Sequence, residues 1–214
     1  LECHDIMCKV GEIVVSGGVR RSAMISLSNL SDDRMRHAKS GNWWETAPHR
    51  ALANNSVSYT EKPDMETFLR EWTALVESKS GERGIFNRQA SKKQAAKNGR
   101  RDTEWEFGTN PCSEIILRPY QFCNLSEVVV RVTDDLKSLS NKVRLATIIG
   151  TLQSSLTKFP YLRKVWQNNT EEERLLGVSL TGIMDNPLLT AKNKGLAQTL
   201  DHLRLVAVDT NKEW

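Results

Sequence analysis

Two cysteines, two asparagines and two glutamates lie within residues 108–127, which read GTNPCSEIILRPYQFCNLSE. Asn110 precedes Pro111, and the residue before a proline is kept out of the helical region of backbone space. In an extended chain, residues two positions apart face the same side. The sequence therefore predicts that Asn110, Cys112 and Glu114 point into one pocket.

The carboxylate of Glu114 restricts the chemistry that we expect of Cys112. A neighbouring negative charge raises the pKa of a thiol, which disfavours the thiolate that a protease-type nucleophile needs. A neutral thiol can instead give up a hydrogen atom, while a carboxylate beside it can accept the proton of a substrate hydroxyl. The local pattern therefore favours one-electron chemistry over nucleophilic catalysis.

The composition is that of a globular protein in a reducing compartment. The chain has 214 residues, of which 39% are hydrophobic, and a domain of this length removes roughly 70% of its unfolded surface from water. Its 30 basic and 26 acidic side chains leave a net charge of +4, which gives no reason to expect nucleic-acid or membrane binding. Without a bilayer-spanning run or a signal segment, we expect a cytoplasmic protein whose four cysteines stay thiols.

Apolar side chains at helical spacing predict four helices. The first is expected to end at Gly17-Gly18, and the second to begin at Pro63, where the missing N–H of a proline is harmless. Asp134 and Asp135 suit the N-terminus of the third helix, because acids are favourable there. The apolar stripes cover residues 6–14, 65–76, 145–156 and 196–207.

Short apolar runs between these helices predict strands. The runs at 115–117 and 128–130 are continuous, which is typical of strands buried on both faces. Long helices that alternate with short strands favour an α/β domain with a largely parallel sheet, either open or closed into a barrel. The predicted strands cover residues 19–27, 55–59, 115–117, 128–130 and 176–180.

The segment Asn110-Pro111-Cys112-Ser113-Glu114, followed by Cys123, resembles the catalytic loop of ribonucleotide reductases. Residues 17–23, 79–88 and 177–182 are similar to other segments of that family, in the same order. The GTNPCSEI phrase and the short spacing of the two cysteines are most similar to the adenosylcobalamin-dependent, monomeric-type (class II) ribonucleoside-triphosphate reductases. The resemblance to the metal-radical and glycyl-radical classes is weaker.

This resemblance implies the reduction of ribonucleoside triphosphates to 2′-deoxyribonucleoside triphosphates for DNA synthesis. Cys112 would become a transient thiyl radical that takes the 3′ hydrogen of the ribose. Glu114 would accept the proton of the 3′-hydroxyl, Asn110 would hydrogen-bond the ribose, and the 2′-hydroxyl would leave as water. Cys123 would be one half of a dithiol that supplies two electrons and becomes a disulfide.

The resemblance also implies a fold. Residues 1–214 would be a single partial domain of a ten-stranded α/β barrel, truncated at both ends, with an inner finger loop at about 108–124. Residues 54–56 would face the barrel interior, without an assigned role. The cysteine that pairs with Cys123, the substrate-phosphate loop and a terminal cysteine pair are expected outside the chain, so we expect residues 1–214 alone to be inactive.

The implied cofactor is adenosylcobalamin, which would supply the radical, although no residue is assigned to bind it. The implied partners of the full-length protein are a ribonucleoside triphosphate substrate, a deoxynucleotide effector and a thioredoxin-like reductant.

Two alternatives stay open at this point. One is a diphosphate-reducing or metal-radical enzyme of the same family, and the other is a non-catalytic zinc-binding α/β domain. The spacing of Cys112 and Cys123 argues against zinc, because structural zinc sites usually pair ligands two to four residues apart. We therefore expect no metal site, and we expect Cys3 and Cys8 to be packing residues. The side chains available for zinc would be Cys3, His4, Cys8, Cys112 and Cys123.

Overall fold

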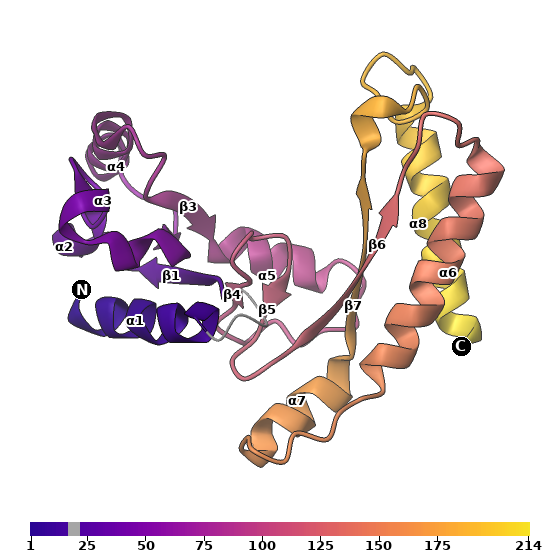
Figure 1. Ribbon diagram of the computed structural model, residues 1–214, viewed down its shortest axis with the longest axis horizontal. Helices are drawn as coiled ribbons and strands as arrows, with labels where there is room; N and C mark the ends of the chain where they lie inside the picture. Colours follow the sequence, from indigo (N-terminus) through magenta and orange to yellow (C-terminus); the bar gives the residue numbers. More distant parts are fainter. Residues whose placement is uncertain (17–21) are drawn as a thin grey trace. The chain divides into compact units, whose positions relative to one another are not determined.

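The computed structural model describes residues 1–16 and 22–214 as two compact units, Leu1–Pro119 and Tyr120–Trp214 (Figure 1). The segment 17–21, which holds most of the predicted family motif 17–23, lies outside the described residues. The first unit contains α1 (Glu2–Ser16), β1 (Met24–Ser28), α2 (Asp33–Arg36), α3 (Trp43–Thr46), the 3-10 helix η1 (Pro48–Leu52), β2 (Ala53–Tyr59), α4 (Met65–Ser78), β3 (Gly84–Asn87), α5 (Arg88–Ala96), β4 (Gly108–Thr109) and β5 (Ile116–Leu117).

A parallel three-stranded sheet is the centre of the first unit. Its order is β1-β2-β3, with Met24 opposite Ala53 and Ser56 opposite Gly84. Strand β2 is buried along almost its whole length, apart from Asn54. Helix α1 lies against this strand, because Nε2 of His4 is 3.0 Å from Oδ1 of Asn55.

The second unit contains a parallel pair of strands covered by helices. Its elements are β6 (Cys123–Val129), α6 (Leu136–Ser154), α7 (Lys164–Glu173), β7 (Leu175–Thr181), the 3-10 helix η2 (Ile183–Asp185) and α8 (Leu196–Glu213). Strands β6 and β7 run in parallel register, with Cys123 opposite Leu175. Helices α6 and α8 lie side by side (Figure 1), and the core between them and β6 includes Val128, Leu139, Val143 and Leu203.

The predicted α/β class with parallel sheets is confirmed. All four predicted helices form, and Asp135 caps α6 with a reciprocal pair of hydrogen bonds to Ser138. The expectation that the strands at 115–117 and 128–130 are buried on both faces is wrong, because β5 is only half-buried and Val129 is 45% exposed. Helix α7 was missed because its polar sequence has no apolar stripe.

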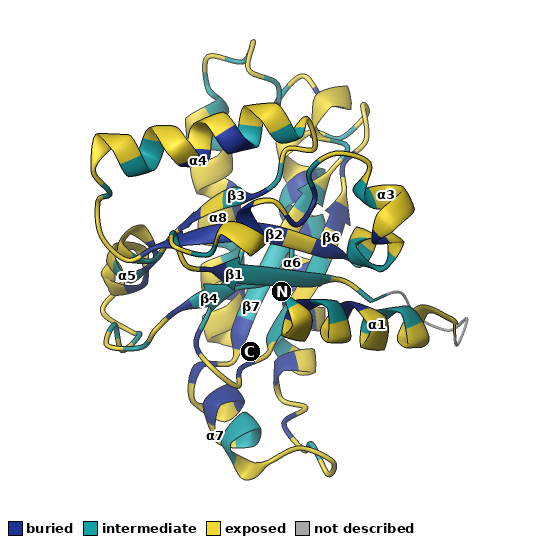
Figure 2. Cartoon of the chain, turned by 90° about the vertical axis from the view of Figure 1, so that its left-hand side faces the viewer, coloured by how far each residue is buried: buried dark blue, intermediate teal, exposed yellow. Residues whose placement is uncertain are grey.

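Three helices expose most of the apolar side chains that predicted them, and Figure 2 shows α1 and α4 as mostly exposed. The buried positions of α1 and α4 are instead small or polar, such as Cys8 and Glu71, whereas α6 buries Leu139 and Val143 rather than the apolar side chains of its predicted stripe. Each stripe therefore predicted a helix correctly but not the face that this chain buries. The exposed side chains are Ile6, Met7, Val10, Ile13 and Val14 in α1, Met65, Leu69, Trp72 and Val76 in α4, and Leu145, Ile149 and Leu152 in α6.

A buried ion network joins α4 to the first sheet. The carboxylate of Glu71 accepts hydrogen bonds from Nε of Arg36 at 2.6 Å and from Nε and Nη2 of Arg83 at 3.0 and 2.7 Å. Arg83 also donates to the Ser28 hydroxyl at the end of β1. Each of these three charged side chains is at least nine-tenths buried, and Arg36 also pairs with Asp33, so two carboxylates balance the two guanidinium groups.

No helix in the described part of the chain combines the length and the apolar character needed to cross a bilayer.

Candidate functional site

Cys112 lies at the tip of a short hairpin in the first unit. Strands β4 and β5 pair antiparallel, with Gly108 opposite Leu117 and Thr109 opposite Ile116, so residues 110–115 form the connecting loop. The base of the hairpin is anchored in the fold, because Phe107 is completely buried and its carbonyl accepts a hydrogen bond from Nε of Arg88 at 2.9 Å. The hairpin is therefore held firmly at its base and presents a six-residue loop.

The loop is a turn, which is one of the two backbone forms, extended or turning, that the dipeptide Asn110-Pro111 favours. The N–H of Ser113 donates to the carbonyl of Asn110 at 3.0 Å, and Ser113 has a φ of 66°, in the left-handed region. The argument that residues two apart face the same side does not apply to such a turn, so a shared pocket for Asn110, Cys112 and Glu114 stays a prediction. Asn110, Cys112 and Glu114 are nevertheless within one loop, where Cys112 and Glu114 are both exposed.

Asn110 closes this loop with its own side chain. Its Oδ1 accepts hydrogen bonds from the N–H of Ile115 at 3.0 Å and from the hydroxyl of Thr109 at 3.4 Å. A second asparagine, Asn54 in β2, donates from Nδ2 to the carbonyl of Pro111 at 2.7 Å. The residue pattern predicted a site role for Asn110. Nothing in that pattern indicated the contact from Asn54, which is 57 residues before Pro111 in the chain.

The described cysteines of the first unit differ in what they can do. Cys8 is 1% exposed, and burial, with the nearby charge of Asp5, raises the pKa of its thiol. It is therefore an inert packing residue, as expected. Cys3 and Cys112 are exposed, so the prediction of a buried packing role for Cys3 is wrong. Cys112 lies on a loop with the exposed Glu114 two residues away, whereas Cys3 lies in α1, where a residue two positions away, such as Asp5, faces a different side of the helix.

Cys123 begins β6 in the second unit and is half-buried. Its neighbour Asn124 donates from Nδ2 to the carbonyl of Leu175 at 3.2 Å, which holds the start of the strand to β7. Each unit is described by itself, so a shared role of Cys112 and Cys123 stays a prediction.

A polar cluster between α1 and η1 was not predicted. Arg50 donates two hydrogen bonds to the carboxylate of Asp5, at 2.7 and 2.6 Å, and these bonds hold the pKa of Asp5 well below its ordinary value. Asp5 also lies 3.0 Å from Nδ1 of His4 and 3.3 Å from Nε2 of His49. The local sequence carries no signal for this cluster, because its members come from two separate elements.

Among the described residues, no three His, Cys, Asp or Glu side chains are grouped so that they could hold a metal ion.

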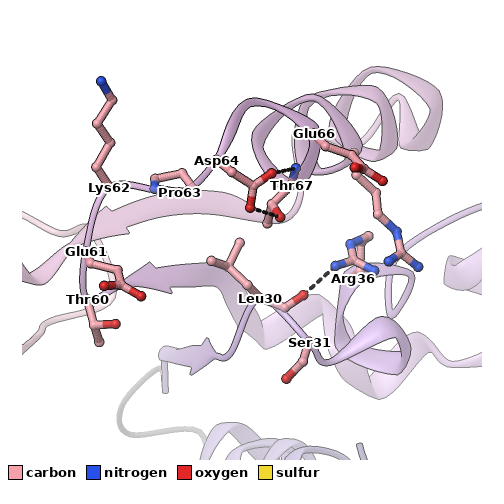
Figure 3. Close-up of a pocket in the computed structure, with 11 residues that line it drawn as sticks. Leu30, Ser31, Arg36, Thr60, Glu61, Lys62, Pro63, Asp64, Glu66 and Thr67 are labelled. Carbon is pink, nitrogen blue, oxygen red and sulfur yellow. Dashed lines mark hydrogen bonds between the residues drawn. The ribbon is translucent and has the colours of Figure 1, made fainter.

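A pocket of about 430 Å³ lies where β1 and β2 end and α4 begins (Figure 3). The carboxylate of Asp64 accepts hydrogen bonds from the N–H and the hydroxyl of Thr67, and Arg36 donates a hydrogen bond to the carbonyl of Leu30. The pocket lies at the carboxyl end of β2, whereas Asn54 and the Cys112 loop lie at the amino end, roughly 20 Å away along the strand. We therefore assign this pocket no part in the chemistry of Cys112.

Comparison with curated proteins finds several relatives that share one name. The chain is 32% identical over 191 residues to the adenosylcobalamin-dependent ribonucleoside-triphosphate reductase of Lacticaseibacillus paracasei, an alignment that covers 86% of the chain. It is 30% identical over 200 residues to the enzyme of the same name from Levilactobacillus brevis, and 30% identical over 198 residues to that from Lactobacillus leichmannii, with 91% and 86% of the chain covered.

The chain spans about a quarter of the length of these relatives, since the alignments cover 24%, 25% and 24% of their sequences. No family model and no solved structure gave a significant match. Over most of its length, the chain is thus a homologue of part of the adenosylcobalamin-dependent ribonucleoside-triphosphate reductases.

Proposed function

We propose that the full-length gene product that includes residues 1–214 reduces ribonucleoside triphosphates to 2′-deoxyribonucleoside triphosphates for DNA synthesis. The observation that carries the proposal is the exposed Cys112 thiol on a closed, anchored loop, in a chain homologous to reductases of that name. An exposed thiol at a loop tip can approach a sugar closely, whereas a buried thiol such as Cys8 cannot.

The residues of the loop have distinct roles in this proposal. The thiyl radical of Cys112 takes the 3′ hydrogen atom of the ribose, and the Glu114 carboxylate accepts the proton of the 3′-hydroxyl. The 2′-hydroxyl then leaves as water. Asn110 holds the ribose through Nδ2, because its Oδ1 is already engaged by the N–H of Ile115.

Cys123 completes the reaction as one member of a dithiol. Two thiols release two electrons and two protons as they form a disulfide, which balances the replacement of the 2′-hydroxyl by hydrogen and its loss as water. Cys112 then returns its hydrogen atom to C3′, which restores the thiyl radical. A thioredoxin-like protein then restores the dithiol by thiol exchange. This chemistry belongs in the reducing cytoplasm, where thiols persist.

Adenosylcobalamin, when bound, supplies the one-electron oxidation of a thiol. The residues present fit such a cofactor because Cys112 is exposed at a loop tip, where a large planar molecule can approach its thiol. We assign no residue of the chain to hold the cofactor.

The same proposal extends to fold and regulation. We infer that residues 1–214 are one part of a ten-stranded α/β barrel, with the loop at about 108–124 inside it and a deoxynucleotide effector bound elsewhere in the full-length protein. The parallel order β1-β2-β3 and the parallel pair β6-β7 support a barrel of parallel half-sheets. The exposed apolar faces of α1, α4 and α6 support burial against further parts of such a fold, because large exposed apolar patches are unusual in monomeric proteins.

Product formation by the full-length protein tests the proposal. Purified protein is incubated with each ribonucleoside triphosphate, and in parallel with each diphosphate, together with a dithiol, with and without adenosylcobalamin, and deoxynucleotides are quantified by chromatography. We expect product only when the corrin cofactor is present. Product formation that is independent of the cofactor, or that requires ribonucleoside diphosphates, would refute the proposal.

A further inference from the structure

Strand β2 presents two neighbouring asparagines to opposite faces of the first sheet, as successive residues of a strand do. Asn55 is 2% exposed and faces α1, where its Oδ1 lies 3.0 Å from Nε2 of His4. Asn54 is exposed and donates from Nδ2 to the carbonyl of Pro111, at 2.7 Å. Asn54 thus contacts the loop that carries Cys112.

The hydrogen bond from Asn54 orients the peptide group that leads into Cys112. The carbonyl of Pro111 and the nitrogen and Cα of Cys112 belong to one planar peptide unit, which rotates as a whole. Pro111 has no N–H, so this carbonyl is its only backbone hydrogen-bonding group. A donor fixed on β2 therefore sets the direction in which the Cys112 side chain leaves the backbone.

The other hydrogen bonds of the loop do not have this effect. Two hydrogen bonds close the loop on itself without joining it to the sheet. They run from the N–H of Ile115 to Oδ1 of Asn110 and from the N–H of Ser113 to the carbonyl of Asn110. Packing cannot hold the tip either, because Cys112, Ser113 and Glu114 are exposed. The tip thus depends on the contact from β2 for its position relative to the first sheet.

We propose that Asn54 is a positioning residue for the Cys112 thiol, acting through its hydrogen bond to the Pro111 carbonyl. This inference rests on the proposed reductase function for its catalytic consequence, but the contact itself can be tested separately. Loss of a typical hydrogen bond shifts a local equilibrium about 2- to 10-fold, and a misplacement of about 1 Å can lower a rate about 100-fold.

The test compares three variants of the full-length protein. Asn54→Ala removes the donor, and Asn54→Asp keeps the shape of the side chain but puts a carboxylate oxygen opposite the carbonyl. Asn98→Asp is the matched control, because Asn98 is an exposed asparagine in the turn after α5. The readouts are hydrogen exchange of the peptide 108–117, measured by mass spectrometry, and kcat and KM for ribonucleotide reduction.

We expect both Asn54 variants to speed exchange in 108–117 about 2- to 10-fold and to lower kcat about 10-fold at an unchanged KM, while Asn98→Asp matches the wild type. A purely space-filling role predicts instead that Asn54→Asp behaves like the wild type, and this result would overturn the inference. Unchanged exchange in both Asn54 variants would overturn it as well, whether or not the protein is a reductase. Absence of reductase activity in the wild type would refute the proposed function alone, since the exchange measurement still tests the contact.

Discussion

The side-chain oxygen of Asn110 accepts a hydrogen bond from the backbone N–H of Ile115, 3.0 Å away. This bond spans the loop between β4 and β5 and keeps Cys112 at its tip. Asn110 therefore combines a structural role, through Oδ1, with the proposed substrate contact through Nδ2. The two roles use different atoms, so two substitutions can separate them.

Asn110→Asp keeps an acceptor oxygen for Ile115 but loses the amide donor, whereas Asn110→Ala loses both. We expect hydrogen exchange of the Ile115 N–H to stay slow in the aspartate variant and to rise about 2- to 10-fold in the alanine variant. The kcat/KM for ribonucleotide reduction should fall about 10-fold or more in both. Equal exchange in the two variants would contradict a loop-closing role for Oδ1.

Cys112→Ser should abolish deoxynucleotide formation, because a serine hydroxyl does not form the radical that the proposed mechanism requires. The substitution is at an exposed position, so we expect the urea midpoint of unfolding to stay unchanged. Cys3→Ser is the control, since Cys3 is also an exposed thiol, and it should keep full activity. Measurable turnover by Cys112→Ser would contradict the assignment.

Glu114→Gln should lower kcat about 100- to 10,000-fold, which is the usual contribution of a general base. Glutamine has nearly the same shape but cannot accept the proton of the 3′-hydroxyl. Glu106→Gln, at an exposed position before the hairpin, is the matched control and should retain the wild-type kcat. A kcat for Glu114→Gln within twofold of the wild type would remove Glu114 from the mechanism.

Glu71→Gln should destabilise the protein by about 3–5 kcal/mol, because it leaves the buried Arg83 without a counter-charge and leaves Arg36 with Asp33 alone. Glu77→Gln in the same helix is the control. Glu77 is exposed, so its substitution should change the free energy of unfolding by less than about 0.5 kcal/mol. Chemical denaturation at neutral pH measures both effects.

The contribution of Glu71 should also depend on pH. Burial by itself raises the pKa of Glu71, but the hydrogen bonds from Arg83 and Arg36 outweigh burial and leave the pKa below its ordinary value. A lowered folded-state pKa means that the stabilisation is fully present above the unfolded-state pKa of about 4.3. It is lost as the pH falls through the folded-state value. The gap in stability between wild type and Glu71→Gln should therefore narrow below about pH 4.3, and a gap that is constant from pH 7 to pH 3 would contradict the ion network.

Gly182→Ala should destabilise the second unit for two reasons. Gly182 has a φ of 75°, which disfavours any side chain, and an added Cβ would lie 2.6 Å from the carbonyl oxygen of Val130. Gly41 has a φ of 62° but nothing within 4 Å of an added Cβ. We expect Gly41→Ala to cost about 1 kcal/mol and Gly182→Ala to cost about 1–3 kcal/mol more. Equal losses in chemical denaturation would exclude the contact with Val130.

The sequence by itself determined the local elements and the chemistry that the loop can carry. The spacing of apolar side chains predicts α1, α4, α6 and α8, because a helix repeats every 3.6 residues whatever surrounds it. The GTNPCSEI segment likewise placed a thiol and a carboxylate two residues apart, and these residues led to the family that the comparisons support.

Tertiary structure alone decided which faces are buried and how the loop is held. Burial depends on what lies opposite an element, so the stripes of α1, α4 and α6 indicated a helix but are exposed in this chain. The hydrogen bond from Asn54 to Pro111 joins residues 57 apart, and no local pattern encodes it. Such contacts arise only when separate elements pack together, which is why the Cys112 loop could be predicted from its own residues and its support could not.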